Sequence, residues 1–197
     1  MSDPFGFETI ARGETTLLRR KRLSDARADY AWQQDPELAR LDGRQPPTES
    51  YEEFLGRFRT NLEFPMDSSA AFSIDDIEGR HVGNLVRYNA VAGACEFGIS
   101  LGEPEARGRG LGRDAICTFL RWAWGSIQWE MVYAHTFEWN EAARACLAHC
   151  GMRAAAFVER PAGRMIRYEA QRAWWLMEDE REPYPRRRIR RAADTTL

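Results

Sequence analysis

The sequence predicts a single α/β (or α+β) domain in which helices cover both faces of one sheet. Three observations carry this prediction. Stretches in which apolar and polar residues alternate are interspersed with stretches in which apolar residues recur at helical spacing. Turn residues separate these stretches into elements of ordinary length. Hydrophobic residues make up 44% of the 197 residues and aromatic residues 12%, which is enough for a sizeable core and excludes a globally disordered chain.

The chain begins with a predicted strand over residues 15–23, followed by two short helices. Ser24 is expected to cap the first helix, which continues to Trp32, because a serine side chain can accept a hydrogen bond from the free N–H groups of a first turn. Asp35 is expected to cap the second helix for the same reason. Pro36 follows it at the first helical position, which needs no N–H donor.

A third helix is predicted after the proline-rich break that follows. Ser50 and Glu53 have the spacing of a capping box, and apolar residues recur at helical intervals as far as Leu62. Pro65 then ends the helix, because proline cannot continue one. A meander of three strands comes next, at residues 70–75, 80–90 and 92–101.

The rest of the chain alternates helix and strand and ends in a hairpin. Residues 116–127 keep helical spacing, and Asn140 is expected to cap a later helix that ends at Gly151. Three further segments are predicted strands, at residues 130–137, 154–160 and 164–172. With the strands named above, they make seven strands in one sheet.

Composition limits the class of protein. No apolar run approaches the ~18 residues of a membrane-spanning helix, and residues 1–10 lack the basic start and apolar core of a signal peptide. The four cysteines are expected to remain thiols, because a cytosolic chain is kept reduced. We therefore expect a cytoplasmic protein that makes no membrane contact.

Arginine concentrates at the C-terminal end of the chain. Residues 181–197 carry six arginines against Glu182 and Asp194, whereas the whole chain has a formal net charge of −2. A cluster of arginines can neutralise phosphates, so this segment could contact nucleic acid or the ribosome. The alternative is a simply solvated tail. We expect residues 1–176 to form the domain and residues 177–197 to form an Arg-rich C-terminal tail.

The stretch from Glu103 to Leu120, EPEARGRGLGRDAICTFL, places three glycines directly before a helix. Without side chains to cover them, the N–H groups at a helix N-terminus make a ready site for an anion. Two common phosphate motifs do not fit. The dinucleotide pattern G-x-G-x-x-G fails because Arg113 stands at its last position, and the Walker loop fails because the stretch has no lysine.

Two motifs carry a resemblance to a known family. Residues 107–112, RGRGLG, have the spacing [QR]-x-x-G-x-[GA], which resembles the pyrophosphate loop of the GNAT superfamily of acetyl-CoA-dependent N-acetyltransferases. Residues 132–153 are similar to a strand–Asn–helix–Gly segment of the same superfamily. The residues at the expected intervals in that segment are Asn140, Ala143 and Gly151.

Two upstream segments, residues 17–43 and 77–89, resemble one branch of that superfamily, the ribosomal-protein N-terminal (alanine) acetyltransferases. The resemblance as a whole runs roughly from Leu17 to Tyr168. It implies a GNAT-like acetyltransferase domain over residues 1–176, with a central mixed, mostly antiparallel sheet of about seven strands that splays between the fourth and fifth. It also implies acetyl-CoA as cosubstrate, an amine as acceptor and no metal.

The resemblance further implies which residues bind the cofactor. The diphosphate falls on the glycine-rich loop, and the pantetheine arm lies along the last residues of the 92–101 strand. Asn140 serves both as helix cap and as cofactor ligand. The residues expected to bind acetyl-CoA are Ile99, Ser100, Leu101, Arg107, Gly108, Arg109, Gly110, Leu111, Gly112, Arg113, Asn140 and Arg144.

Transfer to an amine requires a base, because a primary amine has a pKa of ~8–10 in water and must be neutral to attack. In the strand that ends at Leu101, Glu96, Gly98 and Ser100 share one face, an unusual composition for a packing surface. Glu96 is therefore the candidate base, working through a water, and Ser100 is a second catalytic candidate. A structural ion pair with an arginine is the alternative for Glu96.

The other catalytic assignments depend on departures from the family pattern. In much of the superfamily a tyrosine seven residues after the asparagine protonates the departing thiolate, but this position is Leu147 here. The ribosomal branch often lacks that tyrosine as well. His135 is expected to be a packed or hydrogen-bonded residue and becomes a candidate base only if Glu96 is not one. The C-x-x-H-C pattern at 146–150 lacks a fourth ligand, so no metal site is expected.

The acceptor is the least defined part of the prediction. Trp32, Tyr51 and Trp139 are candidate substrate contacts, because acceptor sites in the superfamily are built largely by the first two helices and the last hairpin. The branch implies a protein N-terminus, whereas other relatives acetylate polyamines or aminoglycosides. A catalytically silent acetyl-CoA sensor or scaffold is the rival function, and a homodimer is left open.

Overall fold

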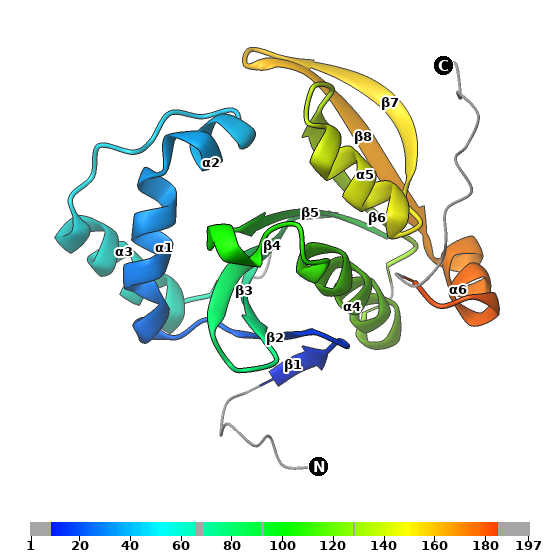
Figure 1. Cartoon of the computed structure of the whole chain (residues 1–197), viewed down its shortest axis with the longest axis horizontal. Helices are drawn as coiled ribbons and strands as arrows, with labels where there is room; N and C mark the ends of the chain where they lie inside the picture. The colour runs from blue at the N-terminus through cyan, green and yellow to red at the C-terminus, as the bar shows by residue number, and fades with distance from the viewer. Residues whose placement is uncertain (1–8, 66–68, 92, 128, 185–197) are drawn as a thin grey trace.

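The computed structural model of the chain describes residues 9–65, 69–91, 93–127 and 129–184. One sheet of eight strands, in the order β1-β2-β3-β4-β5-β6-β8-β7, forms its centre (Figure 1). The strands are β1 (Thr9–Arg12), β2 (Thr16–Arg20), β3 (Ala70–Asp76), β4 (His81–Val91), β5 (Ala94–Leu101), β6 (Met131–Phe137), β7 (Arg153–Arg160) and β8 (Gly163–Gln171). All neighbours are antiparallel except β5 and β6, which are parallel. The predicted mixed, mostly antiparallel sheet is confirmed.

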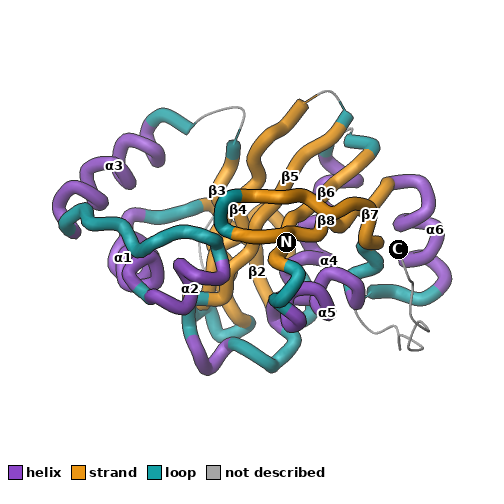
Figure 2. The backbone as a smooth tube through the Cα atoms, turned by 90° about the horizontal axis from the view of Figure 1, so that it is seen from above, coloured by secondary structure: helices purple, strands orange, loops and turns teal. Residues whose placement is uncertain are grey.

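Helices lie around this sheet. They are α1 (Ala26–Gln34), α2 (Pro36–Leu41), α3 (Tyr51–Glu63), α4 (Leu111–Ser126), α5 (Glu141–His149) and α6 (Arg172–Arg181), with short 3-10 turns at Leu23–Asp25 and Pro104–Ala106. The first three helices group on one side of the molecule and α6 on the other (Figure 1, Figure 2). None of the helices in the part of the chain described is long and apolar enough to cross a membrane.

Most predicted helix caps are confirmed. Asp35 caps α2 by accepting a hydrogen bond of 2.8 Å from the N–H of Glu37. Ser50 and Glu53 form the reciprocal pair of a capping box at the start of α3. Asn140 caps α5 by accepting a hydrogen bond of 3.1 Å from a main-chain N–H of the first turn. These caps were predictable because each depends on residues within one turn of each other.

The predicted cap at Ser24 is wrong. Ser24 lies inside the 3-10 turn that precedes α1, and Asp25 stands at the N-cap position of α1 without a side-chain hydrogen bond to that helix. The carboxylate of Asp25 accepts a hydrogen bond of 2.9 Å from the N–H of Arg22 and makes a two-pronged ion pair with Arg19 of β2. A contact with another strand therefore decides where this helix begins.

The two faces of the sheet are covered in different ways. The face toward α4 is apolar, and the ring of Phe119 lies 5.4 Å from Phe97 of β5 and 6.3 Å from Phe72 of β3, centroid to centroid. The face toward α1 is polar and ionic. Arg19 lies there between Asp25 and Asp75, and all three side chains are at most 5% exposed. Helix α1 is thus held by paired charges, and α4 by hydrophobic packing.

Two elements were not predicted. Strand β1 pairs with β2 at the edge of the sheet, which brings the strands to eight. Helix α6 runs across the boundary expected between residues 176 and 177, and the ring of Tyr184 stacks on Trp175 at 5.3 Å. The described fold therefore continues to Tyr184. Of the predicted Arg-rich tail, residues 177–197, the part from 185 to 197 lies outside the described residues.

Candidate active site

The glycine-rich loop connects the end of β5 to the start of α4. Gly108 and Gly110 have φ angles of 71° and 87°, in the left-handed region that glycine adopts without strain. Gly110 is the N-cap of α4, and within the described residues no side chain caps this helix. A Cβ atom on Gly108 would point into open space. The first N–H groups of α4 are therefore left for a ligand, at the positive end of a helix of 16 residues.

The three arginines of the loop have different surroundings. Arg107 donates hydrogen bonds of 3.0 Å to the carbonyl oxygens of Leu101 and Gly102, so its guanidinium holds the entrance of the loop in place. Arg109 is exposed and does not line the neighbouring cavity. Arg113 lines that cavity beside the N-terminus of α4 and is the arginine best placed for an anion.

Strands β5 and β6 diverge beside this loop. They pair at only three positions, where Ala94, Cys95 and Glu96 face Met131, Val132 and Tyr133. Beyond Glu96, the edge of β5 that faces β6 has no strand partner in the described part of the chain. The predicted fourth and fifth strands are β5 and β6, because β1 was not predicted. The splay predicted between them is therefore confirmed.

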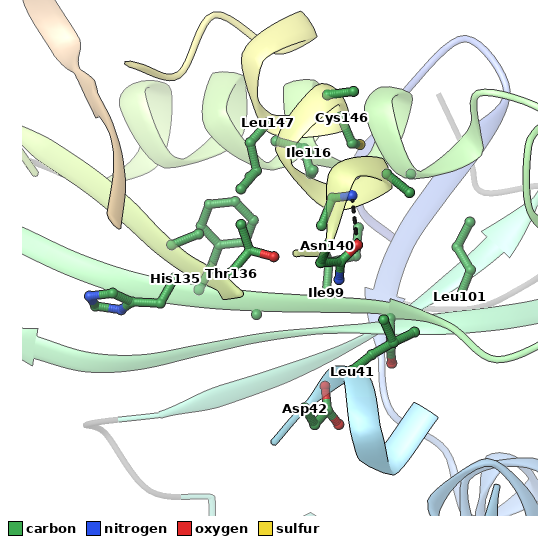
Figure 3. A pocket seen from close by; sticks show the side chains of 18 of the residues that line it. Leu41, Asp42, Ile99, Leu101, Ile116, His135, Thr136, Asn140, Cys146 and Leu147 are labelled. Atoms are coloured by element: carbon green, nitrogen blue, oxygen red, sulfur yellow. Dashed lines mark hydrogen bonds between the residues drawn. The ribbon is translucent and has the colours of Figure 1, made fainter. Parts of the chain in front are cut away.

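A cavity of about 730 Å³ occupies the opening between the two strands. On the face of the sheet that carries α4 and α5, its walls include the loop glycines, Arg113, Asn140, Cys146 and Leu147 (Figure 3). On the opposite face they include Leu38, Leu41 and Asp42 of α2 and its C-cap, with Tyr88, Glu96 and His135 of the sheet. The three β5 residues expected to bind the pantetheine arm, Ile99, Ser100 and Leu101, all line it. The opening thus connects the uncapped N-terminus of α4 to the part of the cavity on the other face.

Helix α5 supplies part of the cavity wall on the α4 side of the sheet. Asn140 lines the cavity while its side-chain oxygen caps the helix, the combination that the sequence predicts (Figure 3). Leu147 is 4% exposed and lines the same wall. Besides Arg109, two residues expected to bind the cofactor lie outside the cavity wall. Leu111 is buried in the core, and Arg144 donates a hydrogen bond of 2.9 Å to the carbonyl oxygen of Glu138.

Glu96 lies on the other face and is held by its neighbours. Its carboxylate lies 2.6 Å from Nδ1 of His135 and accepts a hydrogen bond of 2.8 Å from Nδ2 of Asn89. Burial, together with the negative charge of Glu96, raises the pKa of Tyr88 well above its usual range, so this phenol stays protonated. The arginine partner considered for Glu96 is not among these contacts.

The structure places the three candidate substrate contacts outside the cavity walls. The ring of Trp32 packs where a Cβ on Gly102 would stand, and its Nε1 donates a hydrogen bond of 3.1 Å to Glu103. Tyr51 packs against Tyr30, with 5.3 Å between ring centroids. Trp139 is 44% exposed and stacks on neighbouring side chains beside the opening.

Several residues of the site had no sequence signal. Asn89 reaches Glu96 because a β-bulge puts it in a left-handed conformation, with a φ of 50°. Asp42 follows α2 and enters the cavity only because this helix lies over the open part of the sheet. His135 had a signal, its position on the strand next to Glu96, but the register of the parallel pair decides whether the two meet.

Comparisons with known proteins agree with this geometry. The sequence matches the model of the acetyltransferase (GNAT) domain family over residues 16–153. No curated protein matches it. A spermidine N-acetyltransferase from Vibrio cholerae, solved with CoA and spermine, has a similar structure, with a TM-score of 0.73, 19% identity, and coverage of 82% of this chain and 98% of that one.

Two other solved structures have the same fold. An acetyltransferase of the GNAT family from Bacillus anthracis has a TM-score of 0.70 and 15% identity, and the match covers 83% of this chain and 98% of that one. An aminoglycoside acetyltransferase in complex with coenzyme A has a TM-score of 0.68 and 15% identity, with 85% and 98% covered. With a family model that spans more than half of the sequence, the chain belongs to the acetyltransferase (GNAT) domain family.

Proposed function

We propose that this protein transfers an acetyl group from acetyl-CoA to a primary amine by direct attack on the thioester. The observation that carries the proposal is the cavity through the opening between β5 and β6. It joins an uncapped helix N-terminus on one face to a buried carboxylate, Glu96, on the other. An anionic cofactor and a cationic acceptor can therefore meet in the opening from opposite sides.

The residues on the cofactor side fit acetyl-CoA, which supplies the activated acetyl group. The main chain at Gly108–Gly112 and the side chain of Arg113 would hold the diphosphate, because bare N–H groups and a cation converge there. The unpaired edge of β5 at Ile99–Leu101 would receive the pantetheine arm. Asn140 lines the same wall and would contact that arm.

On the acceptor side, the amine nitrogen forms a C–N bond with the acetyl carbon while the C–S bond breaks and its electron pair leaves with the sulfur. Main-chain N–H groups of β5 can stabilise the negative charge that develops on the carbonyl oxygen. The amine must first lose a proton, and Glu96 is the carboxylate that β5 supplies on its side of the opening. Ser100 lines the cavity on the same strand and can bond the amine or a water.

Two classes of acceptor follow from different observations. The sequence resemblance to ribosomal-protein acetyltransferases favours a protein N-terminus. Two acidic residues of the acceptor side, Asp42 and Glu96, favour a small molecule with several amino groups. The similar structures include a spermidine N-acetyltransferase solved with spermine and an aminoglycoside acetyltransferase, which supports this second class. We propose that the protein acts in the cytoplasm.

The proposal is tested by following thiol release from acetyl-CoA with N-terminal peptides, spermine and ribostamycin as acceptors. We expect turnover with at least one of them. If the protein binds CoA and turns over none, a catalytically silent sensor or scaffold is the better assignment. If it does not bind CoA at all, the proposal fails.

A ribosome contact through the Arg-rich end of the chain is a separate proposal. Because Tyr184 packs on Trp175, a truncation after residue 184 keeps every described contact of the domain. We expect the full chain to retain RNA on a filter at low salt and the truncated chain to lose most of that binding. Equal retention by the two forms would assign the arginines to a solvated tail.

A further inference from the structure

Glu96 and His135 form a close pair beside the opening between β5 and β6. They lie on adjacent parallel strands, where Glu96 is in register with Tyr133, and both side chains project from the same face of the sheet. Glu96 Oε1 and His135 Nδ1 are 2.6 Å apart. The side chains are 9% and 11% exposed, and both line the cavity. The pair is therefore shielded from bulk water but open to a ligand.

The contact determines which nitrogen of His135 carries the proton. A carboxylate can only accept hydrogen bonds, so Nδ1 must be the donor, and the neutral ring then has its lone pair on Nε2. Nε2 makes no hydrogen bond to any residue that the structure describes. A free lone pair on the wall of a cavity is what a proton acceptor needs.

Glu96 itself has less freedom. Its second oxygen, Oε2, accepts the hydrogen bond of 2.8 Å from Asn89, and the bulge that puts Asn89 there is the irregularity in the pairing of β4 with β5. The phenol of Tyr88 packs on the same face, 3.5 Å from the Cβ position of Gly98. Both carboxylate oxygens are thus committed to side chains of the sheet.

We propose that His135 is the catalytic base of the acetyl transfer, through Nε2, and that Glu96 is a positioning residue that fixes the tautomer and orientation of the imidazole. This inference rests on the proposed function and refines the role of Glu96 within it. Nε2 takes one proton from the acceptor amine, directly or through one water. The ring becomes an imidazolium whose charge the Glu96 carboxylate balances, and the proton then passes to solvent.

The other charged and titratable groups around the imidazole come from several elements. Tyr133 lies on the same strand, with 5.7 Å between its ring and that of His135. Arg167 of β8 is in register with His135, but its guanidinium lies over the ring of Tyr133 and pairs with Glu169 at 2.8 Å. Asp42, Tyr88 and Arg160 also line the cavity. Glu96 is thus the charged residue that is hydrogen-bonded to the imidazole ring of His135.

The first test separates the two nitrogens of His135. In His135→Asn the amide can still donate to Glu96 in place of Nδ1, but nothing replaces Nε2. Full-length protein is assayed with acetyl-CoA and the best acceptor among N-terminal peptides, spermine and ribostamycin. We expect kcat to fall by ~10²–10⁴, the usual loss when a general base is removed, with an unchanged KM for acetyl-CoA. A kcat within about threefold of wild type would overturn the proposal, because Glu96 alone would then suffice.

The second test asks whether the two residues act as one unit. Glu96→Gln removes the charge that holds the imidazole, and the double variant with His135→Asn should be no slower than the worse single variant, as for groups of one catalytic unit. Losses that multiply would show independent roles and contradict the dyad. Glu130→Gln, at an exposed position just before β6, is the matched control for the loss of a carboxylate and should keep the wild-type rate.

The third test needs no acceptor and no activity measurement, so it distinguishes failure of this inference from failure of the proposed function. Two-bond ¹H–¹⁵N correlation spectra of the full chain report the tautomer of each neutral histidine. We expect His135, assigned by its loss in His135→Asn, to be protonated on Nδ1. A proton on Nε2 would leave no lone pair facing the cavity and would overturn the proposal even in an active enzyme.

Discussion

Asp114, in the first turn of α4, accepts a hydrogen bond of 2.8 Å from the main-chain N–H of Thr15, 99 residues away in the chain. Its carboxylate also accepts hydrogen bonds from the N–H of Glu14, at 3.0 Å, and from the hydroxyl of Thr16, at 2.8 Å. The acidic side chain in the first turn of α4 is therefore directed at the β1–β2 turn. As a result it does not compete with an anion for the helix N-terminus.

We expect Asp114→Ala to lower the free energy of unfolding, because it leaves the buried hydroxyl group of Thr16 and two partly buried N–H groups of the β1–β2 turn without an acceptor. A buried donor without an acceptor costs about 1–3 kcal/mol. Urea unfolding followed by tryptophan fluorescence measures the change. Glu105→Ala, at an exposed position of the loop before α4, is the control and should stay within about 0.5 kcal/mol of wild type. The same small change in Asp114→Ala would contradict the anchoring role.

A negative charge at Gly110 should abolish CoA binding. Gly110→Asp puts a carboxylate where the diphosphate would meet the N-terminus of α4. Gly110→Ala is the matched control, because it imposes the same backbone strain at a φ of 87° without the charge. In a thermal-shift assay, wild type at 100 times its Kd should gain about 2.7 kcal/mol. If the two variants bound CoA equally, the charge of the ligand would not matter at this site.

Leu147 should not be catalytic, and a tyrosine there tests whether the missing general acid can be restored. The position is buried on the wall of the cavity, so either Leu147→Tyr or Leu147→Phe should cost about 1–3 kcal/mol of stability through overpacking. The two variants differ only in the hydroxyl group. We expect the tyrosine variant to turn over at least as fast as the phenylalanine variant, measured as kcat. A slower tyrosine variant would mean that its hydroxyl group obstructs the cofactor.

The ionic network beneath α1 should make the protein most stable at mildly acidic pH. Its contribution to the free energy of unfolding should decrease both at lower and at higher pH. Burial alone would raise the pKa of Asp25, but hydrogen bonds from Arg19 and Ser73 hold it far below its usual range. That contribution is present above about pH 4 and is lost as pH falls toward the folded-state pKa. Burial alone would lower the pKa of His81, but its hydrogen bond to Asp29 raises it. This second contribution is present below about pH 6.5 and is lost as pH rises through the folded-state pKa.

Urea midpoints of wild type and His81→Gln, measured between pH 5 and pH 8.5, test the alkaline side. Wild type should lose stability over this range, and the variant should lose less, because it has no imidazole to deprotonate. Parallel curves for the two proteins would show that His81 contributes nothing to the pH dependence.

The sequence was informative where a few neighbouring residues decide the structure. The cap at Asp35 and the capping box at Ser50 depend on contacts within one turn, and the loop at Gly108–Gly112 on its own glycines. The sequence was uninformative where the register between strands determines which side chains meet. Asp114 meets the β1–β2 turn, and Glu96 meets His135, only after distant segments have paired.

The wrong prediction at Ser24 has the same origin. Serine is a good capping residue by local criteria. The ion pair of Asp25 with the buried guanidinium of Arg19 on β2, however, fixes the position of Asp25 and leaves Ser24 inside the 3-10 turn. The aromatic residues expected to touch substrate were chosen from their place in the chain. The ring of Trp32 packs on Gly102 instead, a contact that no local sequence pattern predicts.

The short parallel pairing of β5 with β6 is a seam that divides the sheet into two parts. Five strands lie on one side of it and three on the other, and three residue pairs join them. Opening of the seam should therefore be the lowest-energy sub-global motion of the domain. A molecule lodged in the opening would bridge both halves, so amide hydrogen exchange along β5 and β6 should slow on binding more than exchange in β2 and β3. Ligand binding would then stabilise the fold at the place where its two halves are joined most weakly.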